Sequence, residues 1–107
     1  VICNNDGMAE GAISALNDRG YNLGTGKSGK TIPVFGVDAT DSAKQLIADG
    51  KMTGTIKQDA DGMAGGLLHL IKNMSEGKDV MADTGSFNIS EKVSNKIFIP
   101  YAEYTGK

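Results

Sequence analysis

The sequence predicts an α/β fold whose sheet is mainly parallel. Short apolar runs alternate with amphipathic stretches along the chain, and Asn, Asp or Thr marks each changeover. That alternation is typical of strand and helix units that build a parallel sheet. The 107 residues suffice for one domain at most, and 39% hydrophobic with 22% charged residues exclude disordered and collagen-like chains.

The first unit opens with an apolar run, Val1 to Cys3, that we expect to form a strand. The run starts abruptly, as though the front of a strand were missing, and we therefore expect a fragment of a longer protein. Asn5 or Asp6 can cap the next helix, which is predicted to stop near Arg19 with Gly20 as its left-handed cap. The apolar positions of this helix recur at three- and four-residue spacing: Met8, Ala9, Ala12, Ile13 and Leu16.

A polar, glycine-rich segment from Tyr21 to Lys30 follows and is predicted to be an exposed loop. It contains GTGKSGK, which superficially resembles a phosphate-binding loop. That motif needs four residues between its first Gly and the Gly-Lys pair, and it opens a helix. Here Gly24 and Gly26 are too close to Lys27, and a strand comes next, so we expect a solvated turn.

The clearest strand is IPVFGV, residues 32–37, with Asp38 directly after it. Thr40 or Asp41 is then expected to cap a short helix that ends at Gly50. These residues form the second strand and helix unit.

TGTIK, residues 53–57, is a weaker strand with polar alternation. A helix from Asp59 or Asp61 to Met74 follows, and we expect its stripe of Met and Leu residues to pack in the core. The last predicted strands are Ser86 to Ile89 and Lys96 to Tyr101.

Several classes of function are excluded by composition. A net charge of -2, from 11 basic and 13 acidic residues, gives no basic field for nucleic acid. No stretch approaches the roughly 20 apolar residues of a membrane span, and the sequence as it stands leads us to expect no charged and then apolar leader. Cys3 is expected to be a small buried hydrophobe and His69 a partly exposed residue without function; no spacing suits zinc.

Polar side chains follow each of the predicted parallel strands, at the edge where open α/β sheets bind ligands. They are Asn5 and Asp6, then Asp38, then Gln58 and Asp59. A nucleophile with a neighbouring histidine and an oxyanion hole is missing from this set, so we predict a binding protein and not an enzyme. Carboxylates accept hydroxyl protons and amides both donate and accept, which suits a neutral polyhydroxylated ligand.

Helix capping is the alternative explanation for these residues. It accounts fully for Asp6, Asp41 and Asp59, and we prefer it there. It is weaker for Asp38, because Thr40 or Asp41 is better placed to cap the next helix.

The same residues carry a resemblance to a known family. VICNNDGMAEGAISAL, IPVFGVDAT and TIKQDA resemble the second half of periplasmic sugar-binding proteins of the galactose/glucose-binding type, in the ribose-binding-protein-like superfamily. The likeness covers essentially all 107 residues, since KIFIPYAEY is similar to the returning strand of these proteins. It implies a periplasmic-binding-protein-like type I fold, of which this chain holds an incomplete part.

The resemblance also implies a function: a two-lobed protein that closes on a hexose and delivers it to an ABC-type importer or a chemoreceptor. Carried over residue by residue, Asn5, Asp38 and Gln58 are the sugar ligands. Galactose-type members usually have Asn at the position of Gln58 and ribose-type members Gln, which leaves the sugar open. The expected location is periplasmic or extracellular, with or without a lipoprotein anchor.

The resemblance assigns residues 1–58 to the carboxyl-terminal lobe, packs residues 59–95 on the amino-terminal lobe, and makes residues 96–107 the returning strand and tail. No cofactor is expected in this chain, and calcium binding by the intact protein stays open. With the first half missing, apolar sheet edges and one face of the third helix are expected to be uncovered. We therefore expect self-association or a missing partner segment.

Two other functions are weighed against this one. The chain is also compatible with the effector-binding core of a lactose-repressor-type regulator, which a DNA-binding module at the amino terminus of the full gene would reveal. A small enzyme of flavodoxin-like or Rossmann type is disfavoured, because NNDGMAEG after the first strand is not a Gly-x-Gly-x-x-Gly fingerprint.

Overall fold

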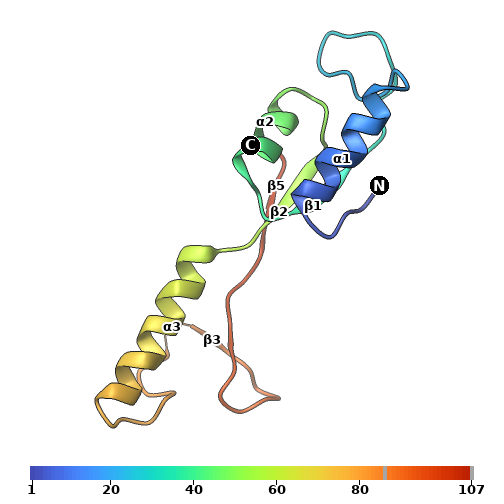
Figure 1. The fold of residues 1–107 in the computed structure, drawn as a ribbon. Helices are drawn as coiled ribbons and strands as arrows, with labels where there is room; N and C mark the ends of the chain where they lie inside the picture. The colour runs from blue at the N-terminus through green and yellow to red at the C-terminus, as the bar shows by residue number, and fades with distance from the viewer. Residues whose placement is uncertain (86, 107) are drawn as a thin grey trace. The chain divides into compact units, whose positions relative to one another are not determined.

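A computed structural model describes residues 1–85 and 87–106, which form two compact units. Unit 1 comprises Val1–Gln58 together with the described residues from Tyr101 onward, and unit 2 comprises Asp59–Pro100. Unit 1 contains α1 (Asp6–Asn17), β1 (Phe35–Val37), α2 (Asp41–Ala48), β2 (Gly54–Lys57) and β5 (Ala102–Tyr104) (Figure 1). Unit 2 contains α3 (Ala60–Ser75), β3 (Asn88–Ile89) and β4 (Ile97–Phe98). Assigning residues 59–95 to a separate lobe stays a prediction.

The sheet of unit 1 has the strand order β1-β2-β5. β1 and β2 are parallel, with Gly36 opposite Thr55, and β5 runs antiparallel to β2, with Tyr104 opposite Thr55. The predicted α/β class with parallel strands is thus confirmed. The expected strand at Val1 to Cys3 is reduced to an isolated parallel bridge between Ile2 and Phe35.

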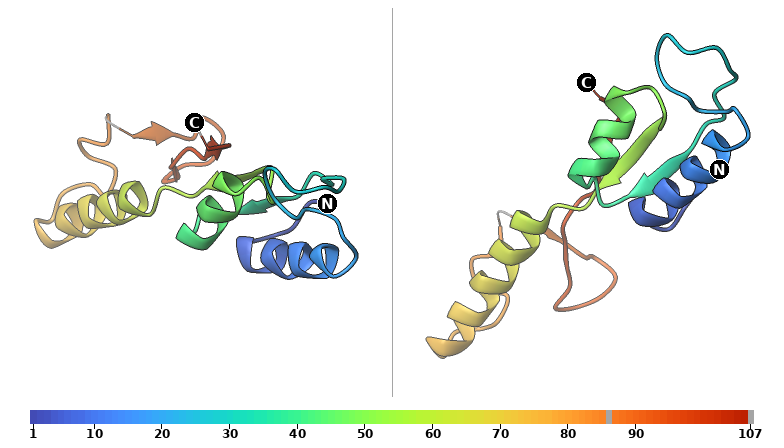
Figure 2. Two further views of the ribbon diagram at one scale, coloured as in Figure 1. Left: turned by 90° about the horizontal axis from the view of Figure 1, so that it is seen from above. Right: turned by 45° about the horizontal axis from the view of Figure 1, so that its top comes forward.

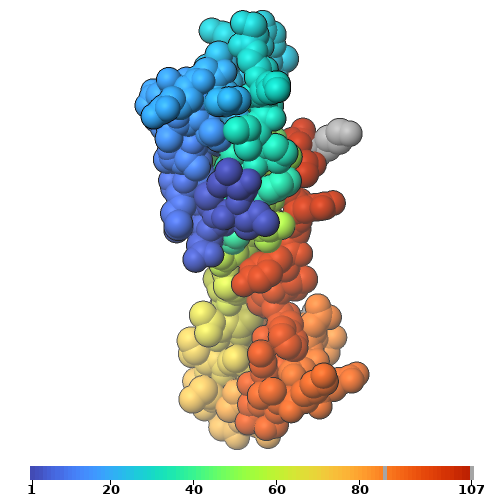
Figure 3. Space-filling view, turned by 90° about the vertical axis from the view of Figure 1, so that its right-hand side faces the viewer, coloured from blue at the N-terminus to red at the C-terminus, as the bar shows by residue number. Residues whose placement is uncertain are grey.

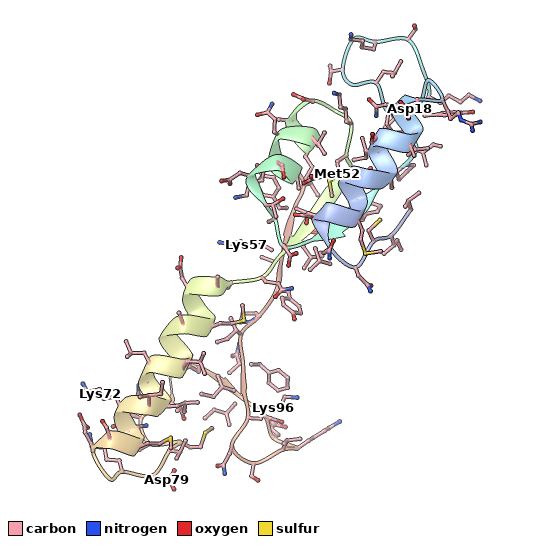
Figure 4. The ribbon with its side chains drawn as sticks, in the orientation of Figure 1. Asp18, Met52, Lys57, Lys72, Asp79 and Lys96 are labelled. Atoms are coloured by element: carbon pink, nitrogen blue, oxygen red, sulfur yellow. The ribbon has the colours of Figure 1, made fainter. Side chains whose placement is uncertain are left out.

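The core of unit 1 lies between one face of this sheet and its two helices. Figure 2 shows α1 and α2 on the same side of the strands, and Met52 lies between the two helices (Figure 4). The buried apolar cluster consists of Ala9, Ile13, Val34, Ala43, Ile47 and Met52. On the opposite face, Phe35 and Ile56 are 40% and 37% exposed. The first residues of the chain, dark blue, lie uncovered beside the β1 segment in Figure 3.

The strand predicted for residues 32–37 begins only at Phe35, because side chains hold the backbone before it. Asn22 is fully buried; its amide donates to Ile32 O at 2.8 Å, and its Oδ1 accepts from Ile32 N at 2.8 Å. Thr53 Oγ1 accepts from Val34 N at 3.1 Å. The loop of residues 21–30 is largely exposed as predicted, but Asn22 is its buried anchor.

The helix amino termini use three side-chain caps. Asn5, Thr40 and Asp59 accept from the backbone N–H three residues later, at 2.9, 3.2 and 3.1 Å. Capping by Asp59 is therefore confirmed. The preferred capping roles of Asp6 and Asp41 are wrong, since these are the first helical residues of α1 and α2.

In unit 2, two polar residues of α3 bond the segment that follows the helix. Asn73 is buried and donates to Val80 O and Ala82 O at 3.0 and 2.8 Å, and His69 Nε2 lies 2.8 Å from Ala82 O. The predicted apolar stripe comprises Met63, Leu67, Leu70, Ile71 and Met74. Leu67, Ile71 and Met74 are 60–63% exposed, whereas Met63 is 39% exposed and Leu70 is half-buried. The expectation that the stripe packs in the core is wrong for Leu67, Ile71 and Met74, and their exposure agrees with the other expectation, that one face of the third helix is uncovered.

β3 and β4 form an antiparallel pair, with Ile89 opposite Ile97. Ser86, where the first of these strands was predicted to begin, lies outside the described residues. Of the predicted closing strand from Lys96 to Tyr101, only β4 in unit 2 is formed; β5, which joins the sheet of unit 1, begins beyond it at Ala102. Pro100 lies between them, and its missing N–H cannot contribute to a strand ladder. Among the described residues, no helix has the length and apolar character needed to cross a membrane.

Candidate functional site

The candidate site lies at the carboxyl end of the parallel strands of unit 1. Asp38 directly follows β1 and Gln58 directly follows β2, so the two residues leave neighbouring parallel strands at the same edge. Gln58 Nε2 donates to Asp38 Oδ1 at 3.1 Å. Asp38 is exposed at this edge. The structure therefore brings two of the three predicted ligands into direct contact.

Asn5 is linked to the same edge through the backbone. Cys3 N donates to Phe35 O at 2.9 Å, which lays the start of the chain along β1. The residue after Asn5 is Asp6, whose Oδ2 accepts from Thr40 N at 2.8 Å. Asn5 uses its Oδ1 to cap α1, and its Nδ2 has no partner within residues 1–85 and 87–106. Capping and ligand binding are thus compatible in Asn5, because they use different atoms of one amide.

The backbone at Asp38 has an unusual conformation. Its φ is +118°, and Ala39 follows with a φ of +54°, in a region that residues other than glycine rarely adopt. Such a residue costs of order 1–3 kcal/mol and persists only where its surroundings hold it. Asp38 N donates to Ile56 O at 2.8 Å, and Ala39 N donates to Thr55 Oγ1 at 3.3 Å. Neighbouring β2 thus holds the loop that presents the Asp38 carboxylate.

Asp6 bonds residues next to the site, in α2's cap and in β2, which its interpretation as a helix cap did not predict. It is fully buried, and besides Thr40 N its carboxylate accepts from Thr55 Oγ1 at 2.6 Å. The sequence held a signal for this burial. Asp6 lies three residues before Ala9 and seven before Ile13, on the same helical stripe as these core residues.

The three candidate residues offer polar groups that can bind a ligand. Asp38 offers carboxylate oxygens, and Asn5 and Gln58 offer amide groups that donate and accept. Among the described residues, no group of three or more His, Cys, Asp or Glu side chains could hold a metal ion. His69 lies in unit 2, with its ring nitrogen on a backbone carbonyl. The site is thus suited to a ligand with several hydroxyl groups.

An α/β unit with exposed polar side chains at the carboxyl ends of its strands is typical of ligand-binding domains. The chain belongs to the periplasmic binding protein domain family, which it matches over residues 1–79. This confirms the family resemblance that the sequence motifs indicated.

Two curated relatives are similar over nearly the whole chain. One is the D-galactose/methyl-galactoside binding periplasmic protein MglB of Haemophilus influenzae, 36% identical over 101 residues. The other is a Rhizobium meliloti protein to which rhizopine binding is attributed, 34% identical over 115 residues. The alignments cover 94% and 100% of this chain but only 27% and 31% of the two relatives. The chain therefore spans less than a third of the length of either relative.

Proposed function

We propose that this chain supplies part of a monosaccharide site in a two-lobed periplasmic binding protein, with a galactose- or glucose-like hexose as ligand. The observation that carries the proposal is the Asp38 carboxylate, exposed beside Gln58 on a strained loop at the carboxyl end of the sheet. A relative named for galactose binding aligns over 94% of the chain and supports the choice of sugar.

In this proposal each residue has a distinct role. The second oxygen of Asp38 accepts a sugar hydroxyl, while its Oδ1 is held by Gln58. The amide oxygen of Gln58 accepts a further hydroxyl proton, and Asn5 Nδ2 donates to a sugar oxygen. Bonds to the charged carboxylate are expected to be the strongest of the set.

The remainder of the site comes from parts of the full-length protein outside this chain. We assign residues 1–58 to the carboxyl-terminal lobe, residues 59–95 to packing on the other lobe, and residues 96–107 to the returning strand and tail. The full-length protein acts as a solute-binding protein in the periplasm or outside the cell. It delivers the sugar to a membrane ABC permease or a chemoreceptor.

Calorimetric titration of the full-length protein with galactose, glucose and ribose tests this function. Asp38→Ala should weaken binding of the preferred sugar by about 3–5 kcal/mol, because it removes a desolvated carboxylate that accepts hydroxyl protons. Asp41→Ala is the matched control, since Asp41 is exposed three residues away and, within residues 1–85 and 87–106, its carboxylate bonds only Lys44, at 3.2 Å. The proposal fails if none of the sugars binds, or if both variants bind like the wild type.

A further inference from the structure

The buried carboxylate of Asp6 is not explained by helix capping or by apolar packing. Asn5 caps α1 and Thr40 caps α2, so neither helix needs Asp6 as its cap. Asp6 is 0% exposed, and a buried polar group is costly unless it is hydrogen-bonded. Its two bonds go to Thr40 N and to Thr55 Oγ1, outside its own helix.

These bonds end on the loop that carries Asp38. The backbone N–H groups of Asp38, Ala39 and Thr40 donate in turn to Ile56 O, Thr55 Oγ1 and Asp6 Oδ2. Three consecutive N–H groups are thus fixed by groups from β2 and α1. Two of these three residues, Asp38 and Ala39, have the positive φ angles.

Thr55 connects both parts of this support. Its hydroxyl donates to Asp6 Oδ1 and accepts from Ala39 N, and its side chain is 2% exposed. Gly36 leaves room for the Asp6 carboxylate, because a Cβ at this position would collide with Asp6 Oδ1. Asp6 and Thr55 therefore act as one buried pair beneath the loop.

We infer that Asp6 and Thr55 are positioning residues, which hold the loop in the conformation that places the Asp38 carboxylate for sugar binding. The inference rests on the proposed function, because it assumes that Asp38 contacts the sugar. Asp6 and Thr55 themselves are buried and act only through the loop.

The test compares Thr55→Val with Thr55→Ser in the full-length protein. Valine keeps the shape of threonine but leaves Asp6 Oδ1 and Ala39 N without their partner, whereas serine keeps the hydroxyl. Thr55→Val should weaken galactose binding about tenfold, the ratio that corresponds to one lost hydrogen bond, and Thr55→Ser should bind like the wild type. Thr55→Ala, which removes the same hydroxyl with less volume, replaces Thr55→Val if that variant does not fold.

Two controls separate positioning from general loss of stability. Ile13→Val removes a buried methyl group but no bond to the loop, so it should lower the melting temperature without changing sugar affinity. In an Asp38→Ala background, Thr55→Val should cause no further loss of affinity. An equal loss in both backgrounds overturns the inference, as does wild-type affinity in Thr55→Val.

Amide hydrogen exchange tests the positioning without any sugar. In Thr55→Val, exchange at Ala39 and Thr40 should accelerate at least about tenfold, while exchange in the middle of α1 stays unchanged. Absence of sugar binding by the wild type would reject the proposed function alone. Unchanged exchange at Ala39 and Thr40 would reject the positioning role whatever the ligand.

Discussion

Asp38 has a strained backbone conformation and is also the proposed sugar ligand. Its φ of +118° is accessible to glycine without a steric penalty, whereas a residue with a Cβ is strained there. Strain of this kind is commonly retained where function requires the side chain. If Asp38 is kept for its carboxylate, glycine at this position should relieve the backbone and lose the ligand.

We predict that full-length Asp38→Gly is more stable than Asp38→Ala by about 1 kcal/mol, while both variants lose sugar affinity. Alanine removes the carboxylate but retains the strained Cβ, so the pair isolates the backbone contribution. Urea unfolding of the two variants measures the difference, and calorimetry checks the shared loss of binding. Equal or greater stability of the alanine variant would show that the loop is not strained at this residue.

Gly36 is needed for a steric reason, since its φ is not in the positive region. A methyl group there would collide with Asp6 Oδ1 and lie 3.0 Å from Met52 Cε. We predict that Gly36→Ala lowers the free energy of unfolding by about 1–3 kcal/mol, because a tight core must shift to admit it. Gly11→Ala is the control: nothing lies within 4 Å of a Cβ at Gly11 in α1, so alanine should stabilise by about 0.5–1 kcal/mol. Urea denaturation of both variants tests the contrast, and equal effects would contradict it.

The place of the candidate residues in the chain was easier to predict from the sequence than the buried contact that supports them. Asp38 and Gln58 follow neighbouring parallel strands, which a parallel sheet brings to one edge, and Asn5 follows the isolated bridge at Ile2. The buried contact between Asp6 and Thr55 was not predicted, because Asp6 was interpreted as a helix cap and Thr55 as part of a polar strand. Only the pairing of Gly36 with Thr55 places the Thr55 hydroxyl beside Asp6.

At the scale of elements, the helices were predicted well and the strands less so. Caps and apolar spacing are local, so α2 and α3 begin within a residue of the predicted caps. Strand bounds depend on which partner is present. Ile2 makes one bridge, and the N–H groups of Ile32 and Val34 donate to side chains instead of a neighbouring strand. The β5 strand was predicted too early, because only its pairing with β2 shows where it begins.

The orientation of α3 shows the same limit. Periodicity identifies an apolar stripe, but it cannot tell whether the rest of the chain covers that stripe. Here Gly66 and Asn73 form the buried side, and Leu67 and Ile71 remain more than half exposed. A stripe of this kind is a candidate surface for association.

We predict that the 107-residue chain self-associates through this stripe. Replacing Leu67 and Ile71 together by Gln should shift sedimentation velocity profiles towards monomer, because it removes exposed apolar surface from the contact. Lys72→Gln, on the polar side of the same helix, is the control and should leave the profile unchanged. A monomeric wild-type chain, or equal behaviour of the two variants, would contradict the prediction.

At the scale of the whole molecule, the sheet of unit 1 has one face covered by helices and one uncovered face. α1 and α2 cover the side of Thr55, whereas the other side has a shallow apolar hollow of about 250 Å³ lined by residues such as Ile2, Phe35 and Ile56. The alternation of strands and helices was enough to predict the α/β class. The open face and the span of less than a third of its relatives agree with an incomplete part of that fold.

Because the chain spans less than a third of its relatives, we expect its affinity for a sugar to be low when it is alone. Periplasmic-type sites bury a ligand from several sides, and small-molecule pockets generally enclose most of the ligand surface. Asn5, Asp38 and Gln58 lie on one exposed edge and offer two or three hydrogen bonds, each contributing about 1 kcal/mol net. That total of about 3 kcal/mol falls short of the roughly 4 kcal/mol needed for a Kd of even 1 mM.

We therefore predict that the isolated 107-residue chain gives no measurable heat with galactose, glucose or ribose, under conditions in which the full-length protein binds its sugar. Circular dichroism of the titrated sample controls for folding, so that missing heat is not mistaken for an unfolded chain. Adding the rest of the protein as a separate polypeptide should restore binding, because it supplies the other contacts around the sugar. Micromolar affinity of the chain alone would mean that this edge is a complete site, and that the two-lobed interpretation is wrong.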